Sequence, residues 1–381
     1  MSDVPRLSAA TLAAAAPDVE PPRYARRSER RICHIGAGRF HRAHQAYYLH
    51  RLLQQGDGEG WGICAIGLKR ADAEVHARLQ PQDQLYSLWE LDGDKRRGTV
   101  VGSLMQWVDA AADADAAIAV MADPATHIIS LTVTESGYCL DARGALDCAH
   151  PDIAHDLAGG APRSAPGLIV RALAARRAAG GSGVTLMSCD NLLENGKVLR
   201  ACMLHFAQRV DAALERWIER ECSFPCSMVD RITPAADDAR SAQLSRELGL
   251  RDDALVFCEP WQQWVIEDHF VAGRPAFEKA GAVFSMRVRD YERMKVGMLN
   301  GGHSALSHVG LLLGHTRVHE ALAVPELRLW LAAYMDDVAQ VLPPLPGVNY
   351  LEYRDALLAR FSNPAIEDRL ARLALDTTAK Y

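Results

Sequence analysis

A lysine near residue 300 has the neighbours that a general base needs. Lys295, Asn300 and His303 occupy a stretch with helical periodicity, and at about 100° per residue Asn300 lies about 140° and His303 about 80° from the lysine. On one side of a helix, a lysine among apolar residues can take a proton, an asparagine can donate to a developing oxyanion, and a histidine can orient a substrate. The same spacing also fits a solvated lysine beside a buried, hydrogen-bonded Asn–His pair.

The segment around this lysine also contains three glycines and a preceding carboxylate. Gly297, Gly301 and Gly302 each cost a helix about 1 kcal/mol relative to alanine, which indicates that a ligand or another backbone lies close by. Glu292 precedes Lys295 by three residues. A carboxylate there can relay protons to the lysine, or it can be an ordinary surface residue.

A glycine turn near the N-terminus has the pattern of a dinucleotide site. The apolar run 31–36 predicts a buried strand, the sequence Gly36-Ala37-Gly38 ends it, and a helical pattern begins at His41. The first glycine of such a turn allows a tight bend, and the second lets the backbone approach a pyrophosphate at the helix N-terminus. The third glycine of the motif is absent and His41 stands in its place, so an ordinary strand-to-helix turn remains an alternative.

The residues after the second predicted strand (62–67) bear on which dinucleotide fits. An acidic side chain there accepts hydrogen bonds from ribose hydroxyls and repels a 2′-phosphate, so Asp72 favours NAD. Lys69 and Arg70 are cations that can tolerate the additional phosphate of NADP. We therefore expect NAD as the cofactor, with tolerance of NADP.

Other pairs of polar residues lack the partners of a metal site. His41 and His44 are three residues apart but have no third ligand, and Cys222 and Cys226 have no second pair at matching spacing. We predict no metal. We interpret the nine cysteines as buried thiols in a reducing cytoplasm rather than as a disulfide framework.

Two further acidic positions have both a functional and a structural interpretation. Asp190 and Asn191 follow the predicted strand 184–188, at the carboxyl edge where open α/β sheets bind ligands. Asp190 can equally cap the helix that follows it. Asp230 and its neighbour Arg231 fit a buried structural ion pair.

Strands and helices alternate through much of the chain, which predicts an α/β fold with a doubly wound parallel sheet covered on both faces. The predicted strands are residues 31–36, 62–67, 127–134 and 184–188, with helical segments at 41–53, 110–121 and 168–178. Beyond Ala280, helical segments follow one another at 291–313, 325–341, 350–361 and 364–375. We place a domain boundary near residue 285, with a dinucleotide-binding domain over 1–285 and a mostly helical substrate domain over 286–381.

The composition excludes several classes of protein. With 381 residues, 49% of them hydrophobic and 24% charged, the chain has ample apolar material for a core and is neither disordered nor collagen-like. The net charge of −6 lacks the basic excess that nucleic acids or anionic membranes attract. No apolar run reaches the roughly 20 residues of a membrane span, and the N-terminal stretch has no signal-peptide core. We expect a cytoplasmic protein whose partner is a small molecule.

Many blocks of the sequence, in order, resemble the polyol-specific long-chain dehydrogenases, the mannitol 2-dehydrogenase family. The matching blocks are residues 34–46, 130–138, 187–191, 224–225, 228–234 and 258–268. The arrangement of Lys295, Asn300 and His303 resembles the catalytic signature of that family. The resemblance runs from about residue 31 to the end of the chain. It implies a Rossmann-like sheet followed by a helical domain, and a metal-independent, NAD-linked oxidation of a sugar alcohol to a ketose.

The resemblance also implies a role for each candidate catalytic residue. Lys295 is the expected general base, and Glu292 connects it to solvent. Asn191 and Asn300 form the expected oxyanion hole for the reverse reduction, and His303 orients the reacting oxygen. The expected binding positions for the other substrate hydroxyls are Asp230, Arg372 and Lys380.

For the cofactor, the resemblance points to the glycine turn and to the end of the second strand. The expected cofactor-binding residues are Gly36, Gly38, Phe40, His41 and Asp72, the last of which discriminates against NADP. Ala71 departs from the family pattern, because mannitol dehydrogenases can carry a second acid there. Full-length relatives continue past Tyr381, so we expect the chain to be truncated relative to the family.

Three functions fit this pattern. The first is an NAD-dependent dehydrogenase for a polyol of the mannitol or arabinitol type, which the segments 298–301 and 345–348 favour. The second is a hexuronate reductase for fructuronate or tagaturonate, whose substrate carboxylate calls for an additional cation in the pocket. The third is a nucleotide-binding chain without turnover, which follows if absent helices are needed to hold Lys295. We expect a monomer.

Overall fold

The centre of the computed structural model, which describes residues 4–235 and 237–375, is a parallel five-stranded sheet. Its strands are β1 (Arg30–Ile35), β2 (Trp61–Gly67), β5 (Leu104–Asp109), β6 (Thr126–Leu131) and β7 (Thr185–Ser188). The spatial order is β5-β2-β1-β6-β7, so the chain winds one way from β1 and then the other way from β6. This is the doubly wound, Rossmann-like sheet that the sequence predicts, and its ligand crevice is expected beside β1 and β6.

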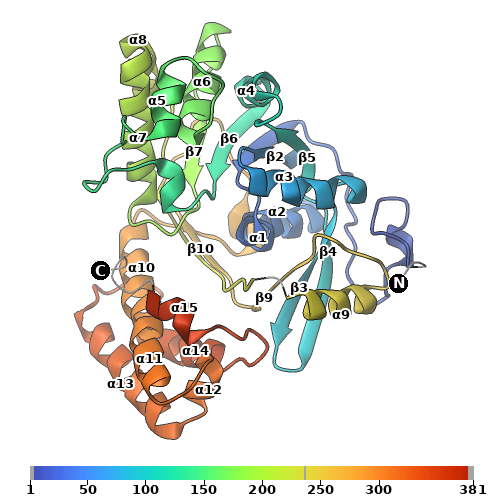
Figure 1. Cartoon of the computed structure of the whole chain (residues 1–381), viewed down its shortest axis with the longest axis vertical. Coiled ribbons are helices and arrows are strands. Elements are labelled where there is room, and N and C mark those ends of the chain that lie inside the picture. The colour runs from blue at the N-terminus through green and yellow to red at the C-terminus, as the bar shows by residue number, and fades with distance from the viewer. Residues whose placement is uncertain (1–3, 236, 376–381) are drawn as a thin grey trace.

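Helices cover both faces of this sheet (Figure 1). Successive strand residues alternate between the faces, so Ile35 and Ile66 enter one buried cluster while Ile32 and Ile63 enter another. The first cluster includes residues of α4, α6, α7 and α8, and the second includes residues of α2. The helices of this part are α1 (Arg39–Ala43), α2 (Gln45–Gln54), α3 (Arg70–Leu79), α4 (Ala114–Ala122), α5 (Pro151–Leu157), α6 (Ala165–Ala178), α7 (Asn195–Val210), α8 (Ala212–Glu221) and α9 (Asp238–Leu248).

Two small sheets extend from the central sheet toward the C-terminal helices. In one, the order is β4-β3-β9, with β3 (Tyr86–Asp92), β4 (Lys95–Val101) and β9 (Val256–Cys258). In the other, the order is β11-β10-β8, with β8 (Ser227–Asp230), β10 (Gln263–Ile266) and β11 (Val283–Phe284). The sequence does not reveal these strands, since several are only two to four residues long. They matter because β8 leads directly into the candidate site.

The C-terminal part consists of helices packed around their own core (Figure 1). They are α10 (Val288–Met294), a π-helical turn (Lys295–Asn300), α11 (Gly301–Leu312), α12 (Val318–Leu322), α13 (Pro325–Val341), α14 (Tyr350–Phe361) and α15 (Leu370–Leu375). The bounds of α13 and α14 agree with the predicted segments. The helix predicted over 364–375 is wrong in its first half, because the Asn363 side chain binds Leu91 and Gly93 of another element and Glu367 has a positive φ of 51°.

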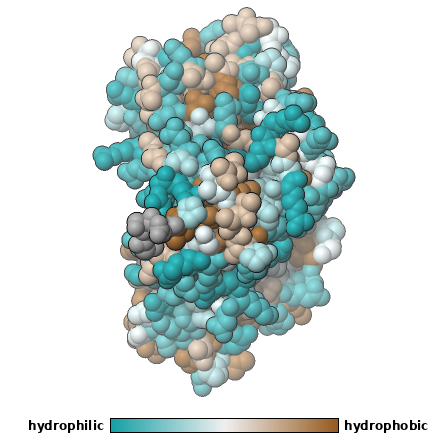
Figure 2. Space-filling model, turned by 90° about the vertical axis from the view of Figure 1, so that its right-hand side faces the viewer, coloured by the Kyte–Doolittle hydropathy of each residue, from teal (hydrophilic) through white to brown (hydrophobic). Residues whose placement is uncertain are grey.

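The surface carries both polar and apolar side chains. The face shown in Figure 2 is largely hydrophilic, with apolar atoms gathered in patches of limited extent. None of the helices within the described ranges combines the length and apolar character needed to cross a bilayer. All nine cysteines are free thiols, and all but Cys148 are buried.

The turn after β1 gives a first prediction. Gly36 has a φ of +87°, and a Cβ on it would lie 2.3 Å from the Thr132 carbonyl oxygen. Gly56 has a similar φ of +83°, with nothing within 4 Å of the added carbon. We expect Gly56→Ala to lower the free energy of unfolding by about 1–2 kcal/mol from the backbone alone, and Gly36→Ala to lower it further. Urea unfolding measures both, and equal losses would contradict the close approach to Thr132.

Candidate active site

The Lys295 amino group is held where the two parts of the molecule meet. Its Nζ donates to Asn191 Oδ1 at 2.6 Å and to the Val229 carbonyl oxygen at 2.7 Å. Asn191 follows β7, at the carboxyl edge of the large sheet, and Val229 lies in β8. Lys295 is 8% exposed. The structure therefore joins two of the predicted catalytic residues, Lys295 and Asn191, by a direct hydrogen bond.

The helix that carries Lys295 is not a regular α-helix. Lys295–Asn300 form a π turn between α10 and α11, in which hydrogen bonds run to the fifth residue rather than the fourth. The separation of about 140° between Lys295 and Asn300 expected for an α-helix is therefore wrong. In a π turn, residues five apart come back nearer to the same side of the helix.

Helix α13 packs against this turn and supports it. A Cβ on Gly297 would lie 2.9 Å from Val338 Cγ1, so a larger residue would push α13 away. The Tyr334 hydroxyl of α13 donates to the Gly297 carbonyl oxygen at 3.1 Å. The sequence predicts a ligand or another backbone close to these glycines. For Gly297 the close neighbour is helix α13 of the same chain. Tyr334, which sequence analysis missed, stabilises the irregular turn.

Asn300 and His303 lie farther along the same helix and are also buried, with 8% and 6% of their surface exposed. The His303 ring stacks on Phe361 of α14, with ring centroids 3.9 Å apart and planes inclined by 13°. His303 also lines a small cavity together with Ile232 and Arg360. The predicted trio is therefore in a largely dry environment, where hydrogen bonds to a reacting oxygen are strong.

Glu292 is buried one helical turn before Lys295. Its two carboxylate oxygens accept hydrogen bonds from the Glu194 backbone N–H at 3.1 and 3.2 Å. Burial raises the pKa of Glu292 to about 7, and this rise outweighs the opposing effects of the Glu194 N–H and of Lys295. A carboxyl group with this pKa exchanges a proton readily near neutral pH. The buried position excludes the alternative of an ordinary surface carboxylate.

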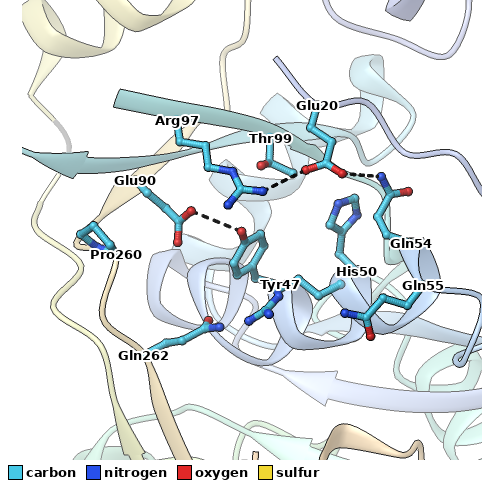
Figure 3. A pocket seen from close by; sticks show the side chains of 11 residues that line it. Glu20, Tyr47, His50, Gln54, Gln55, Glu90, Arg97, Thr99, Pro260 and Gln262 are labelled. Atoms are coloured by element: carbon cyan, nitrogen blue, oxygen red, sulfur yellow. Dashed lines mark hydrogen bonds and ion pairs between the residues drawn. The ribbon is translucent and has the colours of Figure 1, made fainter. Parts of the chain in front are cut away.

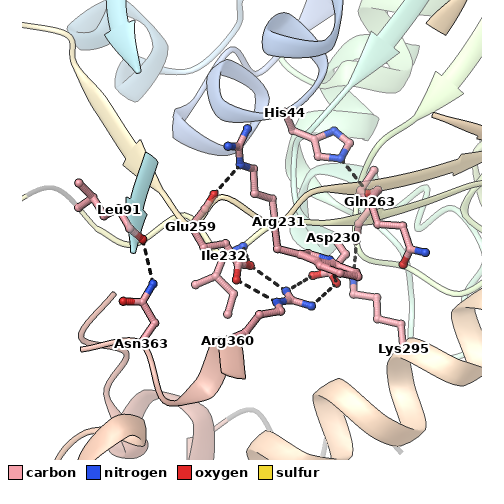
Figure 4. A network of polar contacts seen from close by, with 12 residues as sticks. His44, Leu91, Asp230, Arg231, Ile232, Glu259, Gln263, Lys295, Arg360 and Asn363 are labelled. Carbon is pink, nitrogen blue, oxygen red and sulfur yellow. Dashed lines mark hydrogen bonds and ion pairs between the residues drawn. The ribbon is translucent and has the colours of Figure 1, made fainter. Parts of the chain in front are cut away.

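Asp230 is locked into an ion-pair network with Arg360 (Figure 4). Arg360 of α14 donates to both oxygens of Asp230 at 2.8 Å and to Glu259 at 2.8 and 2.9 Å. Burial alone would raise the pKa of Asp230, but the charge and hydrogen bonds of Arg360 hold it below its ordinary value. Trp261 Nε1 also donates to Asp230, at 3.1 Å. Its accepting oxygens are thus already used within the protein.

The predicted ion pair between Asp230 and Arg231 is wrong. Adjacent residues of an extended strand point to opposite sides, and Arg231 instead binds Glu90 Oε1 at 2.5 Å and the Ala43 carbonyl oxygen at 2.7 Å. Sequence analysis missed Arg360 as the true partner of Asp230. One available signal was its position among the buried residues of α14, a face that is otherwise apolar.

The two remaining candidates for substrate binding lie near the C-terminal end. Arg372 of α15 has 60% of its side chain exposed and pairs with Asp368 at 2.7 Å. The structure thus places its guanidinium in an ion pair with a residue one helical turn away. Lys380 lies outside the described residues.

The glycine turn has the geometry of a phosphate cradle, except that the predicted cofactor residue His41 points away from it. Gly36 closely approaches the loop after β6, and Gly38 is the N-cap of α1. The His41 side chain points into the interior, where it stacks on His34 with ring centroids 3.4 Å apart. Burial lowers the pKa of His41 well below its ordinary value, so the ring is neutral. Phe40 is half-buried and stacks on His44. A phosphate here would meet backbone rather than the His41 imidazole.

Asp72 and its neighbours are engaged at the end of β2. The Asp72 carboxylate accepts the backbone N–H groups of Leu68 and Lys69, both at 2.9 Å, at the N-terminus of α3. Lys69 Nζ binds Asp152 and the Arg163 carbonyl oxygen, both at 2.8 Å. Arg70 has 95% of its side chain exposed. Of the two cations that could tolerate NADP, Arg70 is therefore the less constrained.

Asp190 organises the edge of the sheet next to Asn191. Its carboxylate accepts the backbone N–H groups of Thr134 at 2.8 Å and Val133 at 3.2 Å, and the Tyr138 hydroxyl at 2.8 Å. These groups belong to the loop after β6, so Asp190 links neighbouring strand ends instead of capping a helix. Across residues 4–235 and 237–375, no group of three or more His, Cys, Asp or Glu has the arrangement of a metal site.

Comparison with known families assigns the chain. Residues 30–279 match the mannitol dehydrogenase Rossmann domain, and residues 287–381 match the mannitol dehydrogenase C-terminal domain. The chain belongs to the mannitol dehydrogenase family. This match confirms the resemblance seen in the sequence. The relatives of this chain described next are named as dehydrogenases or oxidoreductases.

Relatives in the mannitol dehydrogenase family extend beyond the matched region. Mannitol 2-dehydrogenase of Cereibacter sphaeroides is 44% identical over 347 residues, which cover 91% of this chain and 72% of the relative. D-mannonate oxidoreductase of Escherichia coli is 42% identical over 359 residues, which cover 93% of this chain and 74% of the relative. The structure of Pseudomonas fluorescens mannitol 2-dehydrogenase, solved as a ternary complex with NAD and D-mannitol, superposes with a TM-score of 0.90 at 44% identity. That match covers 97% of this chain and 76% of the relative.

The raised pKa of Glu292 predicts a pH-dependent contribution to stability. The folded chain holds a proton on Glu292 up to about pH 7, whereas the unfolded chain releases it near the ordinary pKa of glutamate. Between these two pH values the folded state binds more protons, so this group makes stability fall as pH rises. We expect Glu292→Gln to remove that decline, as measured by urea unfolding from pH 4 to 8. Parallel stability profiles of the variant and the unchanged protein would contradict the shift.

The hydrogen bond from Tyr334 to the π turn predicts that loss of this hydroxyl lowers kcat, whereas loss of a comparable hydroxyl elsewhere lowers only stability. We expect Tyr334→Phe to cost about 1 kcal/mol of stability and to lower kcat severalfold, because the turn that aligns Lys295 with Asn300 loses a hydrogen bond. Tyr350→Phe is the matched control, since the Tyr350 hydroxyl also donates to a backbone carbonyl, that of Pro343. We expect it to lose similar stability and to keep kcat. Equal kcat values in the two variants would exclude a positioning role.

Proposed function

We propose that this chain catalyses the NAD-dependent oxidation of a sugar alcohol, of the mannitol or arabinitol type, to the ketose, and the reverse reduction. The observation that carries the proposal is the position of Lys295 Nζ, between Asn191 Oδ1 and the Val229 carbonyl oxygen, at the carboxyl edge of a dinucleotide-type sheet. Membership of the mannitol dehydrogenase family supports the same reaction class. The boundary between nucleotide and substrate domains lies near residue 285 in this proposal, and the enzyme acts as a cytoplasmic monomer.

The chemistry of the lysine follows from its hydrogen bonds. Lys295 Nζ donates to the Asn191 and Val229 oxygens, which hold it at the carboxyl edge of the sheet. In this proposal the neutral amine of Lys295 accepts the proton of the substrate hydroxyl. NAD, held at the turn of Gly36 and Gly38, would supply the acceptor for the hydride that leaves the carbon bearing that hydroxyl. Asn300 and the Asn191 amide stabilise the carbonyl oxygen in the reverse direction, and His303 orients it.

Proton release follows a path along the same helix in this proposal. Glu292 is buried one turn before Lys295, and its pKa of about 7 lets it pass a proton on near neutral pH. No metal is required, because the positive charge of the protonated lysine stabilises the developing oxyanion. The turn supports NAD binding because Gly36 takes the tight bend beside Thr132 and Gly38, with only the Gly36 carbonyl oxygen within 4 Å of an added Cβ, leaves its backbone open to a pyrophosphate.

The charge balance favours a polyol over a hexuronate. A substrate carboxylate needs a cation of its own, and Arg360 is the buried guanidinium beside Asp230 and His303. Two carboxylates, Asp230 and Glu259, already compensate it. An uncharged sugar alcohol therefore suits the described part of this site better. The 42% identity to a D-mannonate oxidoreductase keeps hexuronate reduction as the second candidate.

Replacing the lysine tests the proposal. We expect Lys295→Ala to lower kcat for polyol oxidation by about 10²–10⁴-fold while the variant still binds NAD. The measurement is absorbance of the reduced nicotinamide, with mannitol, arabinitol or sorbitol plus NAD, and with fructuronate plus NADH. Lys279→Ala is the matched control, because Lys279 is an exposed lysine paired with Asp57, and we expect it to keep full activity.

The substrate panel separates the candidates. Turnover of fructuronate alone would transfer the assignment to the hexuronate reductases. A folded protein that binds NAD but turns over none of these substrates would instead be a nucleotide-binding chain without catalysis.

A further inference from the structure

A second cavity lies on the other side of Arg231 from the catalytic lysine. Its volume is about 510 Å³, within the range of small-molecule sites. It is formed by α2, by β3 and β4, and by the segment that follows β9 (Figure 3). None of the predicted catalytic, substrate or cofactor residues lines it. The reaction proposed above leaves this cavity without a role.

The cavity lining is polar and its charges are mostly paired. Glu20 pairs with Arg97 at 3.3 Å and accepts a hydrogen bond from Gln54 at 3.1 Å. Glu90 is compensated by Arg231 and accepts the Tyr47 hydroxyl at 3.4 Å. Such a wall, with donors and acceptors side by side and little net charge, matches a ligand that carries many hydroxyl groups.

Three lining groups have hydrogen-bonding capacity to spare. Thr99 Oγ1 is buried without a hydrogen-bond partner, and so is His50 Nε2. Since the Gly102 N–H donates to His50 Nδ1, and burial lowers the His50 pKa to about 4, the ring is neutral with its proton on Nε2. The Arg51 backbone carbonyl accepts the Gln55 N–H, but its guanidinium forms no hydrogen bond or ion pair with a residue in the described ranges. Buried polar groups of this kind normally have a partner, so their presence here points to a polar ligand.

Arg231 connects this cavity to the catalytic lysine. Its guanidinium binds Glu90 at 2.5 Å and Gln262 at 3.2 Å, both of which line the cavity, and lies over the Tyr47 ring at 4.9 Å. On its other side, Arg231 continues from β8, where the Val229 carbonyl oxygen accepts Lys295 Nζ. A ligand that hydrogen-bonds to Glu90 or Gln262 therefore competes with the contacts of Arg231. Because Arg231 follows directly after β8, this competition changes the support of the strand whose Val229 carbonyl holds Lys295.

We propose that this cavity binds a small uncharged polyhydroxylated molecule, a sugar or sugar alcohol, and that its occupancy alters turnover at Lys295 through Arg231. The hydroxyl groups of the ligand bind Thr99 Oγ1, His50 Nε2 and the Arg51 guanidinium. One hydroxyl also donates to Glu90, the ion-pair partner of Arg231. The binding half stands on the cavity alone, whereas the effect on turnover rests on the proposed dehydrogenase function.

A binding experiment on the whole chain tests the first half. D-glucose serves as the probe, since it is uncharged and is not a sugar alcohol, and its binding is followed by isothermal titration calorimetry. We expect Arg51→Gln to weaken binding about tenfold, the loss of one charged hydrogen bond, and Thr99→Val to weaken it severalfold. Thr99→Val keeps the shape of the side chain and removes a hydroxyl that has no partner, so it does not endanger folding. Arg209→Gln on the exposed end of α7 makes the same change of charge elsewhere and should bind as the unchanged protein does.

Each result of the titration decides the matter. Absence of D-glucose binding, or equal affinities in Arg51→Gln, Thr99→Val and the unchanged protein, overturns the site. Binding of inorganic phosphate in place of D-glucose overturns the ligand class. Binding that weakens in both cavity variants but not in Arg209→Gln supports the site.

Initial rates test the coupling. With saturating D-glucose, we expect the rate of mannitol oxidation to change at least threefold in the unchanged protein and to stay constant in Arg51→Gln. A constant rate in both proteins overturns the coupling while leaving the site. If no substrate is turned over but D-glucose binding follows the variants, the proposed reaction fails and the cavity site stands.

Discussion

The structure depends on one buried guanidinium. Arg360 comes from a helix of the C-terminal part and meets Asp230 and Glu259 of the sheet part with four hydrogen bonds of 2.8–2.9 Å. Removing one partner of such a buried network leaves uncompensated charge and costs about 3–5 kcal/mol. Asp230 directly follows Val229, whose carbonyl oxygen holds Lys295. The contact that joins the two parts of the chain thus lies next to the contact that holds Lys295, the proposed general base.

Around that junction, the candidate site residues are held in place by neighbouring residues that have no proposed part in the reaction. Tyr334 supports the turn that carries Lys295, Asp190 ties together the strand ends beside Asn191, and Phe361 fixes the plane of His303. Each helper comes from a different element. The site is therefore rigid because several elements pack on it, which is what a preorganised polar site requires.

The sequence predicts the sheet, most of the helices and the residues that can do chemistry, because these leave local traces. Apolar runs mark β1, β2, β6 and β7, and helical periodicity marks α13 and α14 to the residue. The sequence does not predict the features that depend on residues far apart in the chain. Arg360 and Asp230 are 130 positions apart, and no local pattern pairs them. The inward turn of His41 depends on its stacking with His34, and the short strands β8 and β10 depend on each other.

The π turn has a consequence for how relatives of this chain are compared. A π turn contains one residue more than the α turn it replaces, so the helix before Lys295 and the helix after Asn300 differ in phase by one position. A homologue that aligns with this chain only through a one-residue gap between 295 and 300 would have a regular helix there. It could retain the lysine, the asparagine and the histidine and still have lost their common direction. Identity of residue types at these positions is therefore a weaker sign of shared activity than an ungapped alignment through the turn.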